Sequence, residues 1–137
     1  MKANSIKSVL FSLVVVLNCT FASAQEEKNF IYDTKYDNNE MMISKTVYEN
    51  IDNYLAPKIQ YQYKHDDMGR VIEKVAYKWD SEEREWVLSH RISCSYNDDQ
   101  TVEIRYGKWN PKDKDFNKDI QNQIYSTDEA SKLISAR

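Results

Sequence analysis

The chain is poor in the residues that break regular structure or carry reactive chemistry. Its 137 residues include two glycines, two prolines, two cysteines and two histidines. The shortage of glycine and proline argues against disorder and against a loop-rich fold. A zinc site needs three or four histidine or cysteine ligands, so this supply is thin. The sequence also lacks a glycine-rich phosphate loop and the Gly-x-Ser-x-Gly nucleophile motif, which excludes the most recognisable enzyme classes.

The first 24 residues have the three parts of an export signal. Lys2 and Lys7 give a positive start, residues 9–17 are almost uninterruptedly apolar, and residues 22–24 read Ala-Ser-Ala, which suits a signal peptidase. The apolar run is too short to cross a hydrocarbon core of roughly 30 Å. We therefore predict cleavage before Gln25, no membrane span, and a mature protein in the periplasm or outside the cell.

Lipid attachment at Cys19 is the alternative fate of this segment. Bacterial lipid-attachment sequences usually have a small residue just before the cysteine, where this chain has Asn18. We therefore expect cleavage without lipidation.

Residues 25–137 are predicted to form a single acidic β-repeat domain. The first 24 residues hold two of the 19 basic side chains and none of the 22 acidic ones, so the remainder has five more acids than bases. This sign is wrong for a nucleic-acid partner, whose phosphates require positive charge. Cys94 is then the one cysteine left and has no partner for a disulfide. We interpret it as a small buried residue.

Apolar residues recur at every second position in four segments, as on strands with one buried face. The clearest segment, residues 86–96, puts six side chains on one side: Trp86, Leu88, His90, Ile92, Cys94 and Tyr96. Residues 70–79 put Val71, Val75, Tyr77 and Trp79 on one face and leave Lys74 and Lys78 on the other. Residues 59–63 and 102–106 alternate in the same way. No comparable stripe has a helical period, so we expect strands.

These segments repeat along the chain. Turn-like anchors at positions 36, 65, 96 and 125 are 29, 31 and 29 residues apart. The aromatic pair Trp79 and Trp86 recurs 30 residues later as Trp109 and Phe116. Regular spacing of this kind indicates an internal repeat. We predict an all-β protein, an antiparallel meander of seven or eight strands built from about three hairpin repeats of roughly 30 residues.

Residues 63–70 read Tyr-Lys-His-Asp-Asp-Met-Gly-Arg, which resembles the YD repeat of RHS-type proteins, Tyr-x-Tyr-Asp-x-x-Gly-Arg. His65 stands at the second tyrosine of that motif, and Gly69 suits the left-handed residue of a bulged hairpin. The whole chain resembles a family of small secreted proteins of unknown function from Bacteroides-type bacteria. The resemblance implies a fold of repeated β-hairpins and no assigned activity.

The candidate catalytic residues are weak. His65 replaces a tyrosine of the repeat and His90 lies on an apolar strand face, so we interpret both as packing residues. The acid pairs at 66–67, 82–83 and 98–99 lie in predicted turns, where such side chains bond to nearby backbone. We expect no catalytic residue and no cofactor, and we predict that the protein is not an enzyme. An enzyme would instead show a pocket lined by convergent acids together with His90.

One segment resembles a metal site. Residues 113–119 carry acids at alternate positions, like the opening of a calcium loop. The sixth position of that loop needs glycine and holds Lys118, and the twelfth needs an acid and holds Ile124. We interpret the segment as a solvated hairpin turn and expect no metal.

The aromatic residues give the sharpest functional hypothesis. Most are predicted to form cross-strand pairs, but an exposed aromatic surface would be a binding site. On that basis the candidate ligand-binding residues are Trp109, Trp79 and Trp86. The predicted function is an exported, non-catalytic binding or scaffolding domain of unknown ligand. The alternatives are a glycan-binding module using these aromatics, and a small inhibitor that presents Asp80–Glu85 or Asn110–Asp115 to another enzyme.

Overall fold

The computed structural model describes residues 29–117 and 121–135. The predicted export signal, residues 1–24, and the alternative lipid site Cys19 lie outside the described residues. The described residues form eight strands and one helix, whose bounds are β1 Phe30–Tyr36, β2 Met42–Ile51, β3 Tyr54–His65, β4 Val71–Asp80, β5 Glu85–Tyr96, β6 Thr101–Asn110, β7 Asp115–Phe116, β8 Gln121–Ser126 and α2 Thr127–Ser135.

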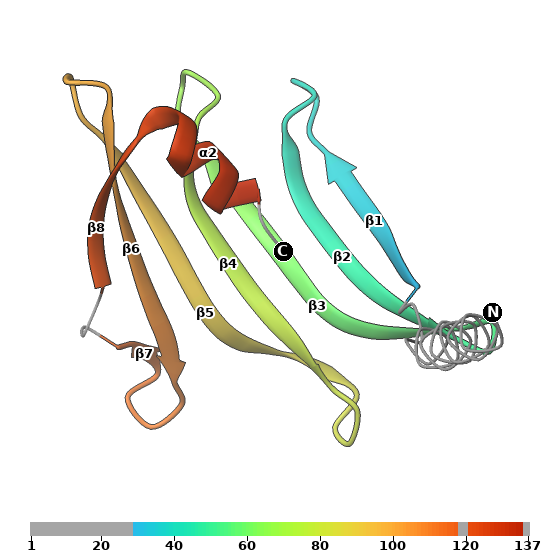
Figure 1. Cartoon of the computed structure of the whole chain (residues 1–137). Helices are drawn as coiled ribbons and strands as arrows, with labels where there is room; N and C mark the ends of the chain where they lie inside the picture. Colours follow the sequence, from blue (N-terminus) through green and yellow to red (C-terminus); the bar gives the residue numbers. More distant parts are fainter. Residues whose placement is uncertain (1–28, 118–120, 136–137) are drawn as a thin grey trace, which may run out of the picture.

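The strands form one antiparallel sheet. Each strand from β1 to β6 pairs with the next in the sequence, so this part of the sheet is a meander. Both β7 and β8 then pair with β6, β7 at Trp109 and Asn110 and β8 along residues 101–106. The predicted all-β meander of hairpin repeats is therefore confirmed. The sheet is twisted and bent, and α2 lies against one face of it (Figure 1). We call that face the inner face and the opposite one the outer face.

The repeat is visible in the backbone of the turns. Glu40, Gly69 and Gln100 all adopt a positive φ, of 61°, 76° and 62°, and their spacing follows the predicted anchors. In the first turn the Asp37 carboxylate accepts hydrogen bonds from the backbone N–H of residues 39 and 41. In the second, Asp66 accepts them from residues 68 and 70 in the same way. The predicted left-handed conformation of Gly69 is therefore confirmed.

The turn geometry predicts opposite effects for two substitutions at equivalent positions. A positive φ costs a residue with a Cβ about 1 kcal/mol or more, and costs glycine almost nothing. We expect Gly69→Ala to lower the free energy of unfolding by about 1 kcal/mol, and Gln100→Gly to raise it by a similar amount. Urea unfolding of the two variants and the parent measures both. Equal signs for the two substitutions would contradict the shared turn geometry.

The core lies on the inner face and consists of two clusters. The first joins α2 to β5 and β6 through five buried residues: Cys94, Val102, Ile104, Ala130 and Ile134. The second lies across β2, β3 and β4 and contains Val47, Tyr61 and Ala76. Tyr61 is directly paired with Ala76, two positions along from the pair Tyr63 and Lys74. Successive residues of a strand alternate between faces, so both pairs point to the inner face. The predicted burial of Cys94 is confirmed.

Register shifts change the predicted strand faces. Val71 pairs with His65 but Glu73 pairs with Lys64, so β4 contains one extra residue between them. Val71 consequently packs in the α2 cluster, whereas Val75 points to the outer face. Lys74, predicted on a polar face, is 3% exposed on the inner face. The prediction that Val71 and Val75 share a buried face opposite Lys74 was therefore wrong, because a bulge resets the alternation.

A second shift lies in β5. His90 pairs with Ala76 but Leu88 pairs with Tyr77, the next residue of β4. Tyr77 points away from Ala76, so Leu88 leaves the face that His90 occupies. Trp86, which pairs with Trp79, lies on the outer face with it. The predicted single face for residues 86–96 was therefore correct from His90 to Tyr96 and wrong for Trp86 and Leu88.

Helix α2 begins where the fourth anchor predicted another turn. The backbone N–H of Glu129 donates to Ser126 Oγ at 3.4 Å, and the Ser126 N–H donates to Glu129 Oε2 at 3.3 Å. This reciprocal arrangement is a capping box, which satisfies backbone donors at a helix start. Ala130 and Ile134, four residues apart, then share the buried side of the helix. The helix therefore replaces the hairpin that the repeat would continue.

Candidate functional site

The three candidate tryptophans lie at the ends of two hairpins on the outer face. Trp79 and Trp86 pack edge to face, with ring centroids 5.1 Å apart and planes at 67°. Trp109 packs on Phe116 in the same way, at 5.2 Å and 67°. All four rings are half-buried. The structure therefore brings Trp79 and Trp86 together in the β4–β5 hairpin. Trp109 is separate from them and packs on Phe116 in the β6–β7 hairpin.

The two histidines have different surroundings. His90 is half-buried beside Tyr106, and its Nδ1 lies 3.1 Å from Ser89 Oγ. Burial, together with the charges of Lys74 and Lys78, lowers the pKa of His90 below its ordinary value, so the ring is neutral at neutral pH. His65 instead lines a cavity on the inner face. His65 was predicted from the sequence to be a packing residue, and no sequence pattern around it indicated this cavity.

The calcium-like segment forms part of an exposed turn. Asn110 Nδ2 donates to Asp113 Oδ2 at 2.7 Å, and Asp115 Oδ1 accepts from the backbone N–H of Phe116. Lys118 and Asp119 lie outside the described residues. Within residues 29–117 and 121–135, no cluster of three or more histidine, cysteine or carboxylate side chains has the arrangement of a metal site.

The candidate site is a cavity of about 450 Å³ between α2 and the inner face. Its walls are mainly apolar, and they are formed by α2, by strands β2 to β5 and by the turn between β3 and β4. The lining residues are Met42, Lys45, Tyr63, His65, Arg70, Val71, Tyr96, Thr127, Ser131, Ile134 and Ser135. Ligand sites in proteins typically have this size and this mixture of apolar walls with a few polar groups.

Three contacts hold α2 over the cavity. Ile134 is buried against the sheet, and its backbone carbonyl accepts a hydrogen bond from Lys74 Nζ at 2.9 Å. Lys74 thus satisfies a carbonyl of the last helical turn, which has no partner within the helix. At the other end of α2, Thr127 Oγ1 donates to the carbonyl of Gln100 at 2.8 Å. The helix is therefore fixed at both ends, and the cavity has a defined roof.

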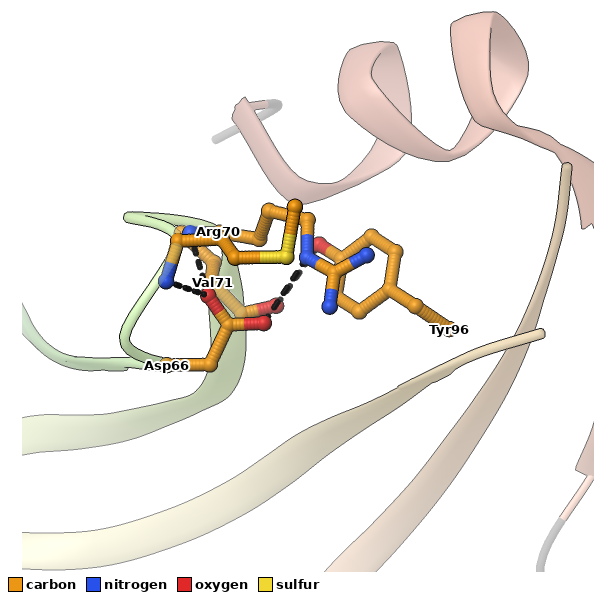
Figure 2. Close-up of polar contacts among 5 residues, drawn as sticks. Asp66, Arg70, Val71 and Tyr96 are labelled. Carbon is orange, nitrogen blue, oxygen red and sulfur yellow. Dashed lines mark hydrogen bonds and ion pairs between the residues drawn. The ribbon is translucent and has the colours of Figure 1, made fainter. Parts of the chain in front are cut away.

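The side wall of the cavity is a linked set of groups (Figure 2). Arg70 Nε lies 2.8 Å from Asp66 Oδ2, and the Arg70 guanidinium stacks 4.3 Å from the centre of the Tyr96 ring. The Tyr96 hydroxyl donates to the carbonyl of Val71 at 2.8 Å. Backbone and side-chain hydrogen bonds from Arg70 lower the pKa of Asp66 below its ordinary value. These contacts tie the β3–β4 turn to the end of β5.

The floor beside the cavity carries two neighbouring lysines, Lys45 and Lys74, close to tyrosine rings. Lys74 Nζ lies 4.3 Å from the centre of the Tyr61 ring and 5.8 Å from that of Tyr63. Burial and then the charge of Lys45 lower the pKa of Lys74 to about 8. Burial raises the pKa of Tyr63 to about 12, so this tyrosine remains a neutral donor. Cations over aromatic faces are stabilised by the ring quadrupole.

One sequence signal could have located this site. The string Ser126-Thr127-Asp128-Glu129 has the spacing of a capping box, and Ala130 and Ile134 follow at helical spacing. Together they predict a short terminal helix with one apolar side. The alternation of the preceding segments obscured this signal, because the anchor at position 125 fits the repeat equally well.

The fold and the cavity together define a class of protein: a twisted antiparallel sheet of hairpin repeats with a terminal helix on one face. Residues 1–127 match the model of the Family of unknown function (DUF3836). The chain belongs to this family, and the matched region ends at the first residue of α2. The predicted resemblance to a Bacteroides-type family of unknown function is confirmed, whereas the resemblance to the YD repeat remains a prediction.

Two solved structures are similar over most of the chain. A DUF3836 family protein from Parabacteroides distasonis ATCC 8503 is 32% identical with a TM-score of 0.70, and the match covers 79% of this chain and 99% of that one. A DUF3836 family protein from Bacteroides vulgatus ATCC 8482 is 24% identical with a TM-score of 0.66, and the match covers 72% and 99%. No match was found among the curated proteins.

Proposed function

We propose that this protein is an exported, non-catalytic binding domain that holds a small ligand in the cavity beneath α2. The observation that carries the proposal is the cavity itself, about 450 Å³ with mainly apolar walls and a roof fixed at both ends. Clefts and cavities of this size and lining bury most of the surface of a small ligand. Two other hollows, one beside Tyr77 and one beside Phe116, have less apolar linings.

The export part of the proposal rests on residues 1–24, with their positive start, apolar run and Ala-Ser-Ala site. The non-catalytic part rests on the lining of the cavity. Ser131 Oγ donates to the carbonyl of Thr127, and Ser135 Oγ to that of Lys132, so both hydroxyls are bonded to their own helix. Nucleophilic catalysis requires a hydroxyl or thiol within reach of a base. Among the described residues, no helix is both long and apolar enough to span a bilayer.

The two alternative functions stay predictions. Glycan recognition by Trp79, Trp86 and Trp109 requires open ring faces, whereas each ring is half-buried and packed edge to face. Inhibition of another enzyme requires a protruding loop, and the exposed turns at residues 81–84 and 111–114 remain available for it. The cavity is favoured over both because it combines mainly apolar walls with a few polar groups in one place.

A substitution that fills the cavity tests the proposal. Ser131 lines the cavity from α2, so Ser131→Phe puts a large ring into the ligand space without lowering helix propensity. A fragment library screened by protein NMR should give ligands whose shifts map to α2 and to the inner face, and Ser131→Phe should weaken them at least tenfold. The matched control is Lys132→Phe, one position along on an exposed part of the helix. Equal binding by both variants would contradict the site.

A further inference from the structure

We propose that the cavity beneath α2 selects an amphipathic carboxylate, an acid with an aliphatic or aromatic body. The inference rests on the binding function proposed above and names the class of ligand for the same site. Its basis is the separation of charge around the cavity. The two charged side chains in its lining, Lys45 and Arg70, are both positive, and none of its lining residues is an aspartate or glutamate. This is the reverse of the chain as a whole, which has 22 acidic and 19 basic side chains.

Lys45 is the group best placed to bind the carboxylate. Within the described part of the chain no acid forms an ion pair with it, and its ammonium instead lies 4.9 Å from the centre of the Tyr32 ring. A lysine is a flexible point charge and can turn from a ring face to an anion. Its charge also lowers the pKa of buried Lys74, so the two cations repel each other. A bound anion relieves that repulsion, which a neutral ligand does not.

Arg70 limits the charge of the ligand. Its guanidinium is paired with Asp66 and stacked on Tyr96, so its charge is already balanced and its plane forms a wall (Figure 2). A phosphate or another multiply charged group would need several unpaired donors, as in sites built from arginine clusters. This cavity instead offers one lysine without an acid partner among the described residues. A ligand with a single carboxylate matches this one positive charge.

The remainder of the lining suits an apolar body. Met42, Val71 and Ile134 contribute aliphatic surface, and the rings of Tyr63 and Tyr96 contribute aromatic surface. Burying apolar ligand surface against such walls provides the main driving force for binding, and a buried charge-assisted hydrogen bond fixes the orientation. The head group is therefore expected near Lys45 and the tail beneath α2.

Three ten-carbon probes that differ only in the head group test this inference: decanoate, decanol and decylammonium. Each is titrated into the purified protein below its micelle concentration or, for decanol, below its solubility limit, and binding is followed by calorimetry and by backbone NMR shifts. We expect decanoate to shift signals of α2 and of residues 63–71, decanol to bind at least tenfold more weakly, and decylammonium not to bind. A charged hydrogen bond is worth about this factor or more.

A charge-removing variant locates the head group. Lys45→Gln should weaken decanoate at least tenfold and leave decanol unchanged. The matched control is Lys64→Gln: Lys64 lies between the two cavity residues Tyr63 and His65 but pairs with Glu73 on the outer face, at 2.8 Å. This variant should bind decanoate like the parent.

The outcomes separate the ligand class from the binding function. Decanol or decylammonium binding at the cavity as tightly as decanoate would overturn the carboxylate assignment and leave the binding function standing. A Lys45→Gln variant that retains full affinity for decanoate would also overturn it. If no probe shifts a cavity signal while the fragment screen yields cavity ligands, only the class is wrong. If both experiments leave the cavity signals unmoved, the binding function itself fails.

Discussion

Replacing Ile134 with alanine should lower the free energy of unfolding by about 2–4 kcal/mol, as large-to-small changes in a core do. Ile134 is 8% exposed and lies in the cluster with Cys94, Val102 and Ile104. Its side chain is the main apolar contact that holds α2 on the inner face, since the other buried residue of the helix is Ala130. The loss should be read from urea unfolding, followed by circular dichroism.

The neighbouring residue provides the control. Leu133 is 45% exposed and is absent from the buried cluster, so Leu133→Ala should change the free energy of unfolding by less than about 0.5 kcal/mol. Both substitutions place alanine in the same helix and remove a similar volume. If the two variants lose equal stability, α2 does not dock by the side described above, and the cavity has no roof.

The second large effect is a rise of stability with pH caused by Lys74. Its pKa is about 8 in the folded protein against an ordinary 10.5. Between these values the unfolded chain binds the proton more tightly, so the free energy of unfolding increases as the pH rises. The stability that Lys74 contributes is present above pH 10.5 and is lost as the pH falls through about 8. The full difference is about 3 kcal/mol, of which about 1 kcal/mol is gained by pH 9.

Other groups on the inner face titrate in neighbouring ranges. Burial raises the pKa of Cys94, Tyr61 and Tyr63, and these groups lower the stability as the pH rises above about 9. The pKa of His90 is lowered, so this group changes the stability only at pH values around and below its ordinary pKa of 6.5. The groups that face the Lys74 ammonium include Lys45 of β2, the two tyrosines of β3, His90 of β5 and the Ile134 carbonyl of α2.

A comparison of variants isolates the contribution of Lys74. Lys74→Met keeps the length of the side chain and removes its charge, so the rise between pH 7.5 and pH 9 should disappear. Lys78→Met, in the same strand at an exposed position, should keep it. Unfolding by urea at fixed ionic strength across this range measures both. A rise that persists in Lys74→Met would mean that the ammonium is not desolvated in the folded protein.

The strands and turns of this fold could be predicted from the sequence because they depend on local patterns. Alternating apolar residues define a strand whatever its partner is, and the 30-residue spacing of Trp79 and Trp109 gave the repeat before any contact was known. The structure gives the two aromatic pairs the same interplanar angle of 67°. The turn conformation at Gly69 also follows from the properties of glycine alone.

The inner face could not be predicted in the same way. Which side of β4 is buried depends on a bulge opposite His65, and a bulge is a property of two paired strands. Lys74 illustrates the consequence: in the sequence it looks like a solvated lysine, whereas its surroundings are the tyrosine rings of the paired strand β3 and the carbonyl of Ile134, which lies far along the chain. The cavity was missed for the same reason, because α2 has to be docked before a space beneath it exists.

The position of Cys94 gives this protein a built-in reporter. The thiol is 6% exposed in the cluster that α2 covers, and burial raises its pKa, so a thiol reagent reaches it slowly while the helix is docked. Its labelling rate therefore measures how often the helix detaches from the sheet. A ligand held beneath α2 would lower this rate, and the decrease with ligand concentration would give the affinity without any optical signal from the ligand.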